Sequence, residues 1–250
     1  MTAGANGQER LVPWVTYFLI IVNAAVWAYE LVASASIFGP SDQVLGGLSF
    51  YWPNVLPHGV GNTANADWSL LLISMFTHAS WDHIVGNMAF LLTFGPKVEN
   101  LFASHPRRYL GHFGFLVFYL LGGSLASFWF VASGGVYEGA IGASGAIAFV
   151  LGIYWWAFPK SVITVPLSTQ KVKAFYYLGF WFLMQAGLDL FGGTAGGVAY
   201  GAHFGGFLFG LFLAWGYRFK RFGETSFGLL ELPWKLSPRD ALDALGALIG

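Results

Sequence analysis

Residues 141–150 read IGASGAIAFV, which places a serine between small residues at the start of an apolar segment. A serine hydroxyl becomes a good nucleophile only when a base removes its proton. The Gly-x-Ser-Gly pattern is a weak indication alone, because 34 of the 250 residues are glycine. Ser144 is therefore a candidate nucleophile only if other segments bring a base and hydrogen-bond donors to the same place.

The composition is typical of a helical membrane protein. Hydrophobic residues make up 56% of the chain and charged residues only 10%, and the mean hydropathy is +0.60. Soluble domains carry about 25% charged residues, so the repeated apolar runs favour an all-α polytopic bundle over a large soluble core. The formal net charge is zero, which gives no reason to expect a nucleic-acid partner. Cysteine is absent, which excludes disulfides and thiolate chemistry.

Six membrane spans are predicted. They cover residues 14–38, 82–93 (after an apolar approach at 69–77), 109–132, 142–158, 174–191 and 196–217. This divides the chain into a cytoplasmic segment 1–13, a six-span domain 14–217 and a cytoplasmic tail 218–250 that contains a short helix. The connection 39–80 is apolar and free of Lys and Arg, which predicts a structured external loop partly embedded in the membrane.

The basic residues test this span count. With six spans, all twelve Lys and Arg fall in the termini, the 2–3 loop and the 4–5 loop, and none falls in the other three loops. By the positive-inside rule both termini are cytoplasmic. Residues 1–10 show no cleavable signal pattern and no transit peptide, so we expect insertion in the plasma membrane of a bacterium or archaeon.

Depth in the membrane places a histidine level with Ser144. Trp156 and Trp215 mark the cytoplasmic interface of spans four and six. Ser144 and His203 each precede their tryptophan by 12 residues, which is about 18 Å of helix. Because the hydrocarbon core is about 30 Å thick, Ser144 is expected about 10 Å below the external surface.

Span two brings two more polar residues to this level. His83 and Asn87 lie about 21 Å and about 15 Å above Lys97, on one face of the helix. A tetrahedral intermediate needs hydrogen-bond donors, and these two side chains with the backbone N–H of Ser144 are candidates. His203 is the candidate base. Asp189 lies near the outer end of span five, so we expect a Ser–His dyad without an orienting acid.

Glycines at four-residue spacing in span six, with Gly145 and Gly152 in span four, would let the two backbones approach closely.

The simpler interpretation treats each polar residue separately. An intramembrane serine often bonds back to its own helix, and a lone histidine often fills a packing role. We expect a structural role for His78, and no role for the remaining histidines, His58, His105 and His112. A metal site of His78, His83 and His203 is conceivable, but it would lack a nearby carboxylate and a ligand spacing, which disfavours it.

Three motifs resemble the rhomboid intramembrane serine proteases. Residues 76–88, FTHASWDHIVGNM, followed by Gly95 and Glu99, resemble the signature of the second span of that family. Residues 142–145, GASG, resemble its nucleophile motif, and residues 202–206, AHFGG, resemble its base-bearing span. The resemblance covers spans one to six.

The resemblance implies a protease that cuts transmembrane segments of other membrane proteins near their outer ends. Ser144 would form the acyl-enzyme, His203 would act as base and then acid, and His83 and Asn87 would help to hold the oxyanion. The family also uses a mobile fifth span as a gate, which here would include the turn 192–195. The resemblance implies no metal or cofactor. The implied partners are transmembrane substrates and the lipid bilayer, and the oligomeric state is open.

Two departures accompany the resemblance. Many members carry an aromatic residue four positions after the nucleophile, stacked under the histidine, whereas this chain has Ala148 there and Phe149 one position on. A local rotation of span four would let Phe149 take that place. The first loop also lacks the family's frequent Trp-Arg pair.

Two other functions remain open. A catalytically inactive relative would bind transmembrane helices without cutting them, although such relatives usually lose the serine or the histidine. A channel or transporter would use His83 and His203 as a proton relay, but it would normally show paired acids or inverted repeats, and this sequence shows neither.

Overall fold

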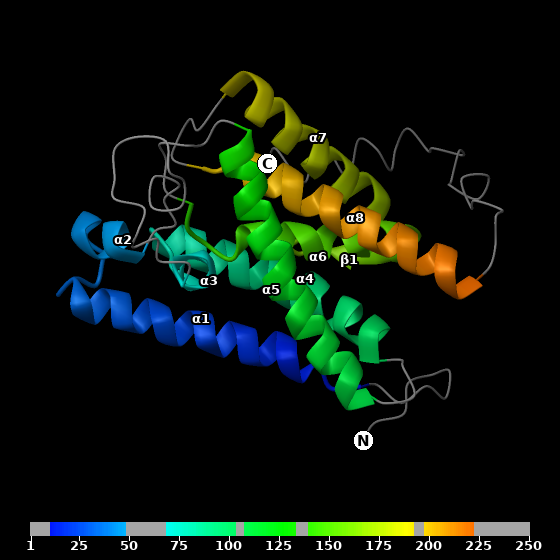
Figure 1. Cartoon of the computed structure of the whole chain (residues 1–250), viewed down its shortest axis with the longest axis horizontal. Coiled ribbons are helices and arrows are strands. Elements are labelled where there is room, and N and C mark those ends of the chain that lie inside the picture. The colour runs from blue at the N-terminus through cyan, green and yellow to red at the C-terminus, as the bar shows by residue number, and fades with distance from the viewer. Residues whose placement is uncertain (1–10, 49–68, 104–107, 134–139, 193–197, 223–250) are drawn as a thin grey trace.

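The computed structural model describes residues 11–48, 69–103, 108–133, 140–192 and 198–222 (Figure 1). Its elements, in chain order, are α1 (Trp14–Ala33), α2 (Asp42–Leu48), α3 (Leu70–Ile73), η3 (Ser74–Phe76), α4 (Trp81–Ala103), α5 (Arg108–Ala132), α6 (Ser144–Ala157), β1 (Val162–Thr164), β2 (Lys171–Lys173), α7 (Ala174–Gly192) and α8 (Tyr200–Phe222). The predicted all-α class is confirmed, with one small hairpin added.

Six long helices lie where the six spans were predicted, with different ends. α1 ends at Ala33 rather than at residue 38, because the chain turns at Ala35, whose φ is 49°. α4 continues ten residues beyond the predicted end and carries Pro96 inside it. Among the described residues, two helices are long and apolar enough to cross a membrane by length and composition, Trp14–Ala33 and Arg108–Phe130. The full six-span topology therefore stays a prediction.

The bundle is built around α6. Every residue from Gly145 to Tyr154 is buried, as expected for a helix that is apolar on all faces. α6 packs most extensively on α8, and also on α5 and α4. Figure 1 shows α1 along one side of the bundle and α7 along the opposite side, with these central helices between them. The candidate nucleophile thus begins the most enclosed helix of the molecule.

The loop between spans four and five contains structure that the sequence did not predict. β1 and β2 pair antiparallel, with Ile163 opposite Val172, and both of these side chains are buried. The alternation of one buried and two exposed positions in each three-residue strand is too short to be recognised as a strand pattern.

His112 was predicted to have no role, and this is wrong. It lies within α5, and its Nδ1 is 2.5 Å from Oε1 of the buried Glu99 of α4. The same carboxylate accepts hydrogen bonds from the backbone N–H groups of Val15 and Thr16 and from the Thr16 hydroxyl. One carboxylate therefore joins α1, α4 and α5 at the end of the bundle where α1 begins.

The described residues of the connection 39–80 include the helices α2, α3 and η3, and residues 49–68 of the predicted embedded loop lie outside the described residues. The predicted tail 218–250 begins inside α8, which ends at Phe222. The expected tail helix, His58, His105 and the turn 193–195 also lie outside the described residues.

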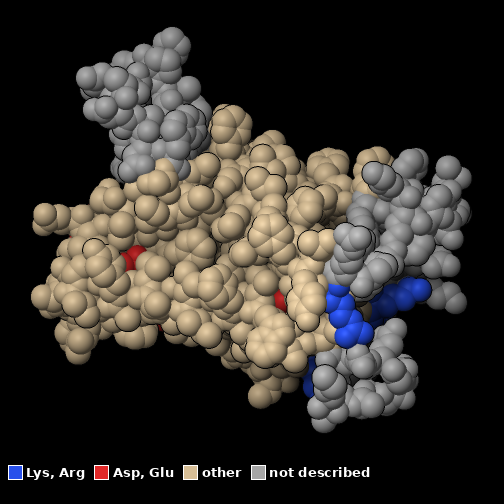
Figure 2. Space-filling model, turned by 60° about the horizontal axis from the view of Figure 1, so that its bottom comes forward, with Lys and Arg blue, Asp and Glu red and all other residues tan. Residues whose placement is uncertain are grey.

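Basic side chains gather at one end of the molecule. On the face shown in Figure 2, the visible Lys and Arg side chains lie together at one end, and uncharged residues cover most of the remainder. The described basic side chains are those of Lys97, Arg108, Lys160, Lys171 and Lys173. This is the distribution that the six-span prediction requires, and the orientation in a membrane stays a prediction.

Candidate active site

Ser144 is the first residue of α6, and a tight turn precedes it. Gly142 has a φ of +107°, which only glycine adopts readily, and its N–H donates to the Ser74 carbonyl at 2.8 Å. The N-cap residue Ala143 makes no side-chain cap. The first N–H groups of a helix have no partner within it, so the backbone at Ser144 begins a row of donors at the site.

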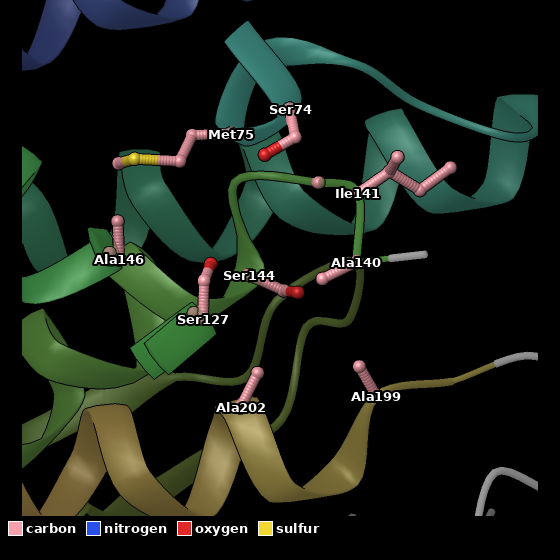
Figure 3. Close-up of a pocket in the computed structure, with 12 residues that line it drawn as sticks. Ser74, Met75, Ser127, Ala140, Ile141, Ser144, Ala146, Ala199 and Ala202 are labelled. Carbon is pink, nitrogen blue, oxygen red and sulfur yellow. The ribbon is translucent and has the colours of Figure 1, made fainter. Parts of the chain in front are cut away.

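A small cavity opens beside Ser144. It has a volume of about 10 Å³, roughly enough for one water molecule. It lies between η3, α5, the turn before α6 and the start of α8, and is lined by Ser74, Met75, Gly123, Ser127, Ala140, Ile141, Gly142, Ser144, Gly145, Ala146, Ala199 and Ala202. Figure 3 shows the Ser144 hydroxyl pointing toward Ala140, with Ala199 and Ala202 on the far side of the space. The side chain is thus directed into the cavity.

Glycine brings α8 against α6, as predicted. A Cβ at Gly206 would overlap the Gly145 carbonyl oxygen, and a Cβ at Gly210 would overlap the Phe149 carbonyl oxygen. The reverse contact holds as well, since a Cβ at Gly152 would overlap the Phe207 carbonyl. The two backbones are therefore in direct contact, which carries the start of α8 to the cavity.

His203 follows Ala202, which lines that cavity, on the first turn of α8. Within the described residues, no hydrogen bond joins the Ser144 hydroxyl to His203. The structure therefore brings the two helices together but does not show the predicted Ser–His pair.

The hydrogen-bond partner of His203 is Gln185 of α7, whose Oε1 is 2.8 Å from His203 Nδ1. The Trp181 ring lies 6.0 Å from the imidazole at an interplanar angle of 31°, and the Tyr200 ring meets it edge-on at 6.3 Å. The sequence analysis missed Gln185 and Trp181. The only available signal was a lone glutamine in an apolar span, one turn after a tryptophan.

Phe149 does not take the position below His203. Its ring would collide with a Cβ at Gly122, so it points toward α5. Ala148 instead faces α8, since its Cβ would be 3.3 Å from a Cβ added at Gly206. Span four is therefore not rotated to place Phe149 under the histidine.

His83 and Asn87 lie beside the turn before Ser144. A Cβ at Gly142 would be 2.6 Å from His83 Nε2 and 3.5 Å from Asn87 Nδ2. The Asn87 amide also donates to His78 Nε2 at 3.0 Å, and His78 Nδ1–H donates to the Phe76 carbonyl at 3.1 Å. The structural role expected for His78 is confirmed, because it orients the Asn87 amide.

Glu30 is a buried carboxylate near the site that the sequence analysis missed. It lies on α1 and accepts the His78 backbone N–H at 3.4 Å. It thus helps to fix the loop that carries His78. Among the described residues, no group of three or more His, Asp or Glu side chains is placed to bind a metal ion.

Comparison with known proteins identifies the family. The model of the rhomboid domain matches residues 65–220, which is well over half of the chain and contains all four candidate site residues. A Bacillus subtilis (strain 168) protein named "Putative rhomboid protease YdcA" is 27% identical over 145 residues. That match covers 58% of this chain and 62% of the relative, which is less than two thirds of the relative's length. With the motifs and this match, the chain belongs to the rhomboid family, whose members are embedded in membranes.

Proposed function

We propose that this protein is an intramembrane serine endopeptidase that cuts peptide bonds in or near the transmembrane segments of other membrane proteins. The observation that carries the proposal is the position of Ser144. It begins the buried central helix and points into a cavity that α8, the helix of His203, also lines. A serine held only for packing would need neither the glycine-dependent turn before it nor a space in front of it.

The proposed reaction uses side-chain or backbone groups of four residues. The Ser144 hydroxyl attacks the scissile carbonyl while His203 Nε2 takes its proton, and the amine product leaves with that proton. The backbone N–H of Ser144, with the side chains of His83 and Asn87, would donate to the oxyanion. Water then hydrolyses the acyl-enzyme, with His203 again as the base. The reaction needs no metal or cofactor.

The length of α6 supports a site below the membrane surface. Its 14 residues span about 21 Å, which is shorter than the hydrocarbon core of about 30 Å. If its basic end lies at the cytoplasmic face, Ser144 lies within the membrane and opens toward the outside. We propose a bacterial or archaeal plasma membrane, cytoplasmic termini, and single-span substrates that enter from the bilayer.

A fluorescent fluorophosphonate probe tests this function. We expect the purified wild-type protein to be labelled and both Ser144→Ala and His203→Ala to lose labelling. The control is Ser124→Ala on α5, because the Ser124 hydroxyl only bonds back to the Leu120 carbonyl at 2.9 Å and this variant should label like the wild type. A peptide or transmembrane substrate should be cut in the same pattern.

The second candidate is an inactive relative that binds transmembrane helices. The specific observation in its favour is that no hydrogen bond joins Ser144 and His203 among the described residues. A folded wild type that stays unlabelled in detergent and in liposomes would favour this function and contradict ours.

A further inference from the structure

The imidazole of His203 is held mainly from α7, a helix outside the three recognised motifs. Gln185 Oε1 lies 2.8 Å from His203 Nδ1, and the Gln185 side chain is only 5% exposed. An amide oxygen can only accept a hydrogen bond, so Nδ1 must carry the proton. The lone pair is then on Nε2, which is the atom that a base must offer to a serine hydroxyl.

The second contact comes from the same face of α7. Trp181 and Gln185 are four residues apart, one turn of helix, and both reach His203. The Trp181 ring lies tilted beside the imidazole, with 6.0 Å between the ring centroids, and it also contacts Phe207 of α8 and Phe90 of α4. The imidazole is therefore confined by a ring and fixed in rotation by a hydrogen bond.

α7 is itself held in register against α8. The Phe182 ring stacks on Phe207 at 4.6 Å and on Phe204 at 5.2 Å, between ring centroids. α6 supplies no such support, because Ala148 is small and Phe149 points toward α5. The aromatic contact that span four lacks is thus replaced by one from α7.

We propose that Gln185, supported by Trp181, is a positioning residue that holds His203 in the tautomer with a free Nε2. This inference rests on the proposed protease function. It also implies that the alignment of the base depends on α7 remaining against α8. A substrate that displaced α7 would therefore need to leave Gln185 in place, or restore it, before the reaction.

The test compares three variants of the full-length protein in detergent. Gln185→Leu keeps the approximate size of the side chain and removes the acceptor. Gln185→Glu keeps an acceptor and adds charge. Leu183→Ala is the matched control, because Leu183 lies on the opposite side of α7 and is 64% exposed. Thermal melting confirms that each variant is folded.

The labelling rate of Ser144 is measured from acid to neutral pH. We expect Gln185→Leu to label about tenfold to a hundredfold more slowly, the loss that is typical when the hydrogen bond that orients a metal-bound imidazole is removed. Gln185→Glu should recover most of that rate. The acidic limb of its pH–rate profile, where labelling falls because His203 becomes protonated, should move to higher pH, because a carboxylate stabilises the protonated imidazole.

The other titratable groups around His203 are the same in every variant. They are His83 of α4, which interacts with it electrostatically, Tyr200 of α8, and Asp189, whose Oδ1 lies 2.8 Å from the Cβ position of Gly201. A shift confined to the Gln185 variants therefore reports the Gln185 contact.

The ¹⁵N resonances of the His203 ring provide a readout that needs no activity. We expect the Nδ1–H form in the wild type and a mixture of tautomers in Gln185→Leu. Identical resonances and identical pH profiles in the two proteins would overturn the proposal, even if the wild type labels normally. A wild type that never labels would overturn the protease function instead, and the resonances would still decide whether Gln185 sets the tautomer.

Discussion

At the scale of single residues, the turn at Gly142 is what joins the candidate oxyanion donors to the nucleophile. Its φ of +107° and its hydrogen bond to Ser74 fix the entry to α6. The same turn brings the α-carbon of Gly142 so close to His83 that an added Cβ would lie 2.6 Å from His83 Nε2. Any side chain at this position must either displace the imidazole or unwind the turn.

Gly142→Ala should therefore harm both stability and activity. We expect the free energy of unfolding to fall by about 1–3 kcal/mol from backbone strain, and probe labelling of Ser144 to slow by about a hundredfold from misplacement of the site. The control is Gly86→Ala in α4, the helix that carries His83 and Asn87, because a Cβ there would meet nothing within 4 Å. Labelling of Gly142→Ala at the wild-type rate would show that this turn does not position the site.

The sequence predicts the site only in part. Helix depth places Ser144, His203, His83 and Asn87 at one level, because distance along a helix fixes height in a membrane, and the sequence motifs contain these four residues. Gln185 and Trp181 could not be found that way, since their role depends on which face of α7 meets α8. A single glutamine in an apolar span forms no repeating pattern from which its hydrogen-bond partner could be predicted. The expected dyad therefore lacked its positioning residue.

At the scale of elements, the contact between α6 and α8 decides whether a serine and a histidine can meet. The glycine spacing predicts that contact, and the structure confirms it at Gly152, Gly206 and Gly210. Lipid is as apolar as the helices, so close packing of small residues, rather than the hydrophobic effect, holds such a pair together.

Gly210→Ala should force the two helices apart. The added methyl would overlap the Phe149 carbonyl of α6, so we expect a loss of about 1–3 kcal/mol in the free energy of unfolding and slower labelling of Ser144. Gly216→Ala is the matched control on the same helix, because a Cβ there would meet nothing within 4 Å. Denaturation in mixed micelles and the labelling rate provide the two measurements, and equal effects of the two substitutions would contradict the argument.

Element ends and the hairpin were the least predictable features. α4 continues through Pro96 to Ala103, whereas the hydropathy pattern predicted that the span ends at residue 93 and that Pro96 lies in the following loop. Gly95 packs closely on Thr16 of α1, and Glu99 of the same helix bonds to α1 and α5, so tertiary contacts hold α4 together beyond the apolar stretch. Such contacts override local propensity and cannot be derived from one sequence.

At the scale of the whole molecule, the charges and the site lie at opposite ends of α6. Lys160, Lys171 and Lys173 follow its C-terminal end, whereas Ser144 begins its N-terminal end. The visible basic residues gather at one end of the bundle in Figure 2. In a membrane, the positive-inside rule would place that end in the cytoplasm and open the cavity at Ser144 toward the outside.

Single cysteines test this orientation without background, because the chain contains no cysteine. Gln43→Cys lies on the exposed surface of α2 in the first connection, and Lys160→Cys lies in the loop after α6, also exposed. We expect a membrane-impermeant maleimide to modify Gln43→Cys in intact spheroplasts and to modify Lys160→Cys only after the membrane is permeabilised. Modification of both from the same side would contradict the six-span arrangement, because an odd number of spans must separate the two positions. Since that arrangement also sets the depth of Ser144, such a result would remove the basis for placing the site within the membrane.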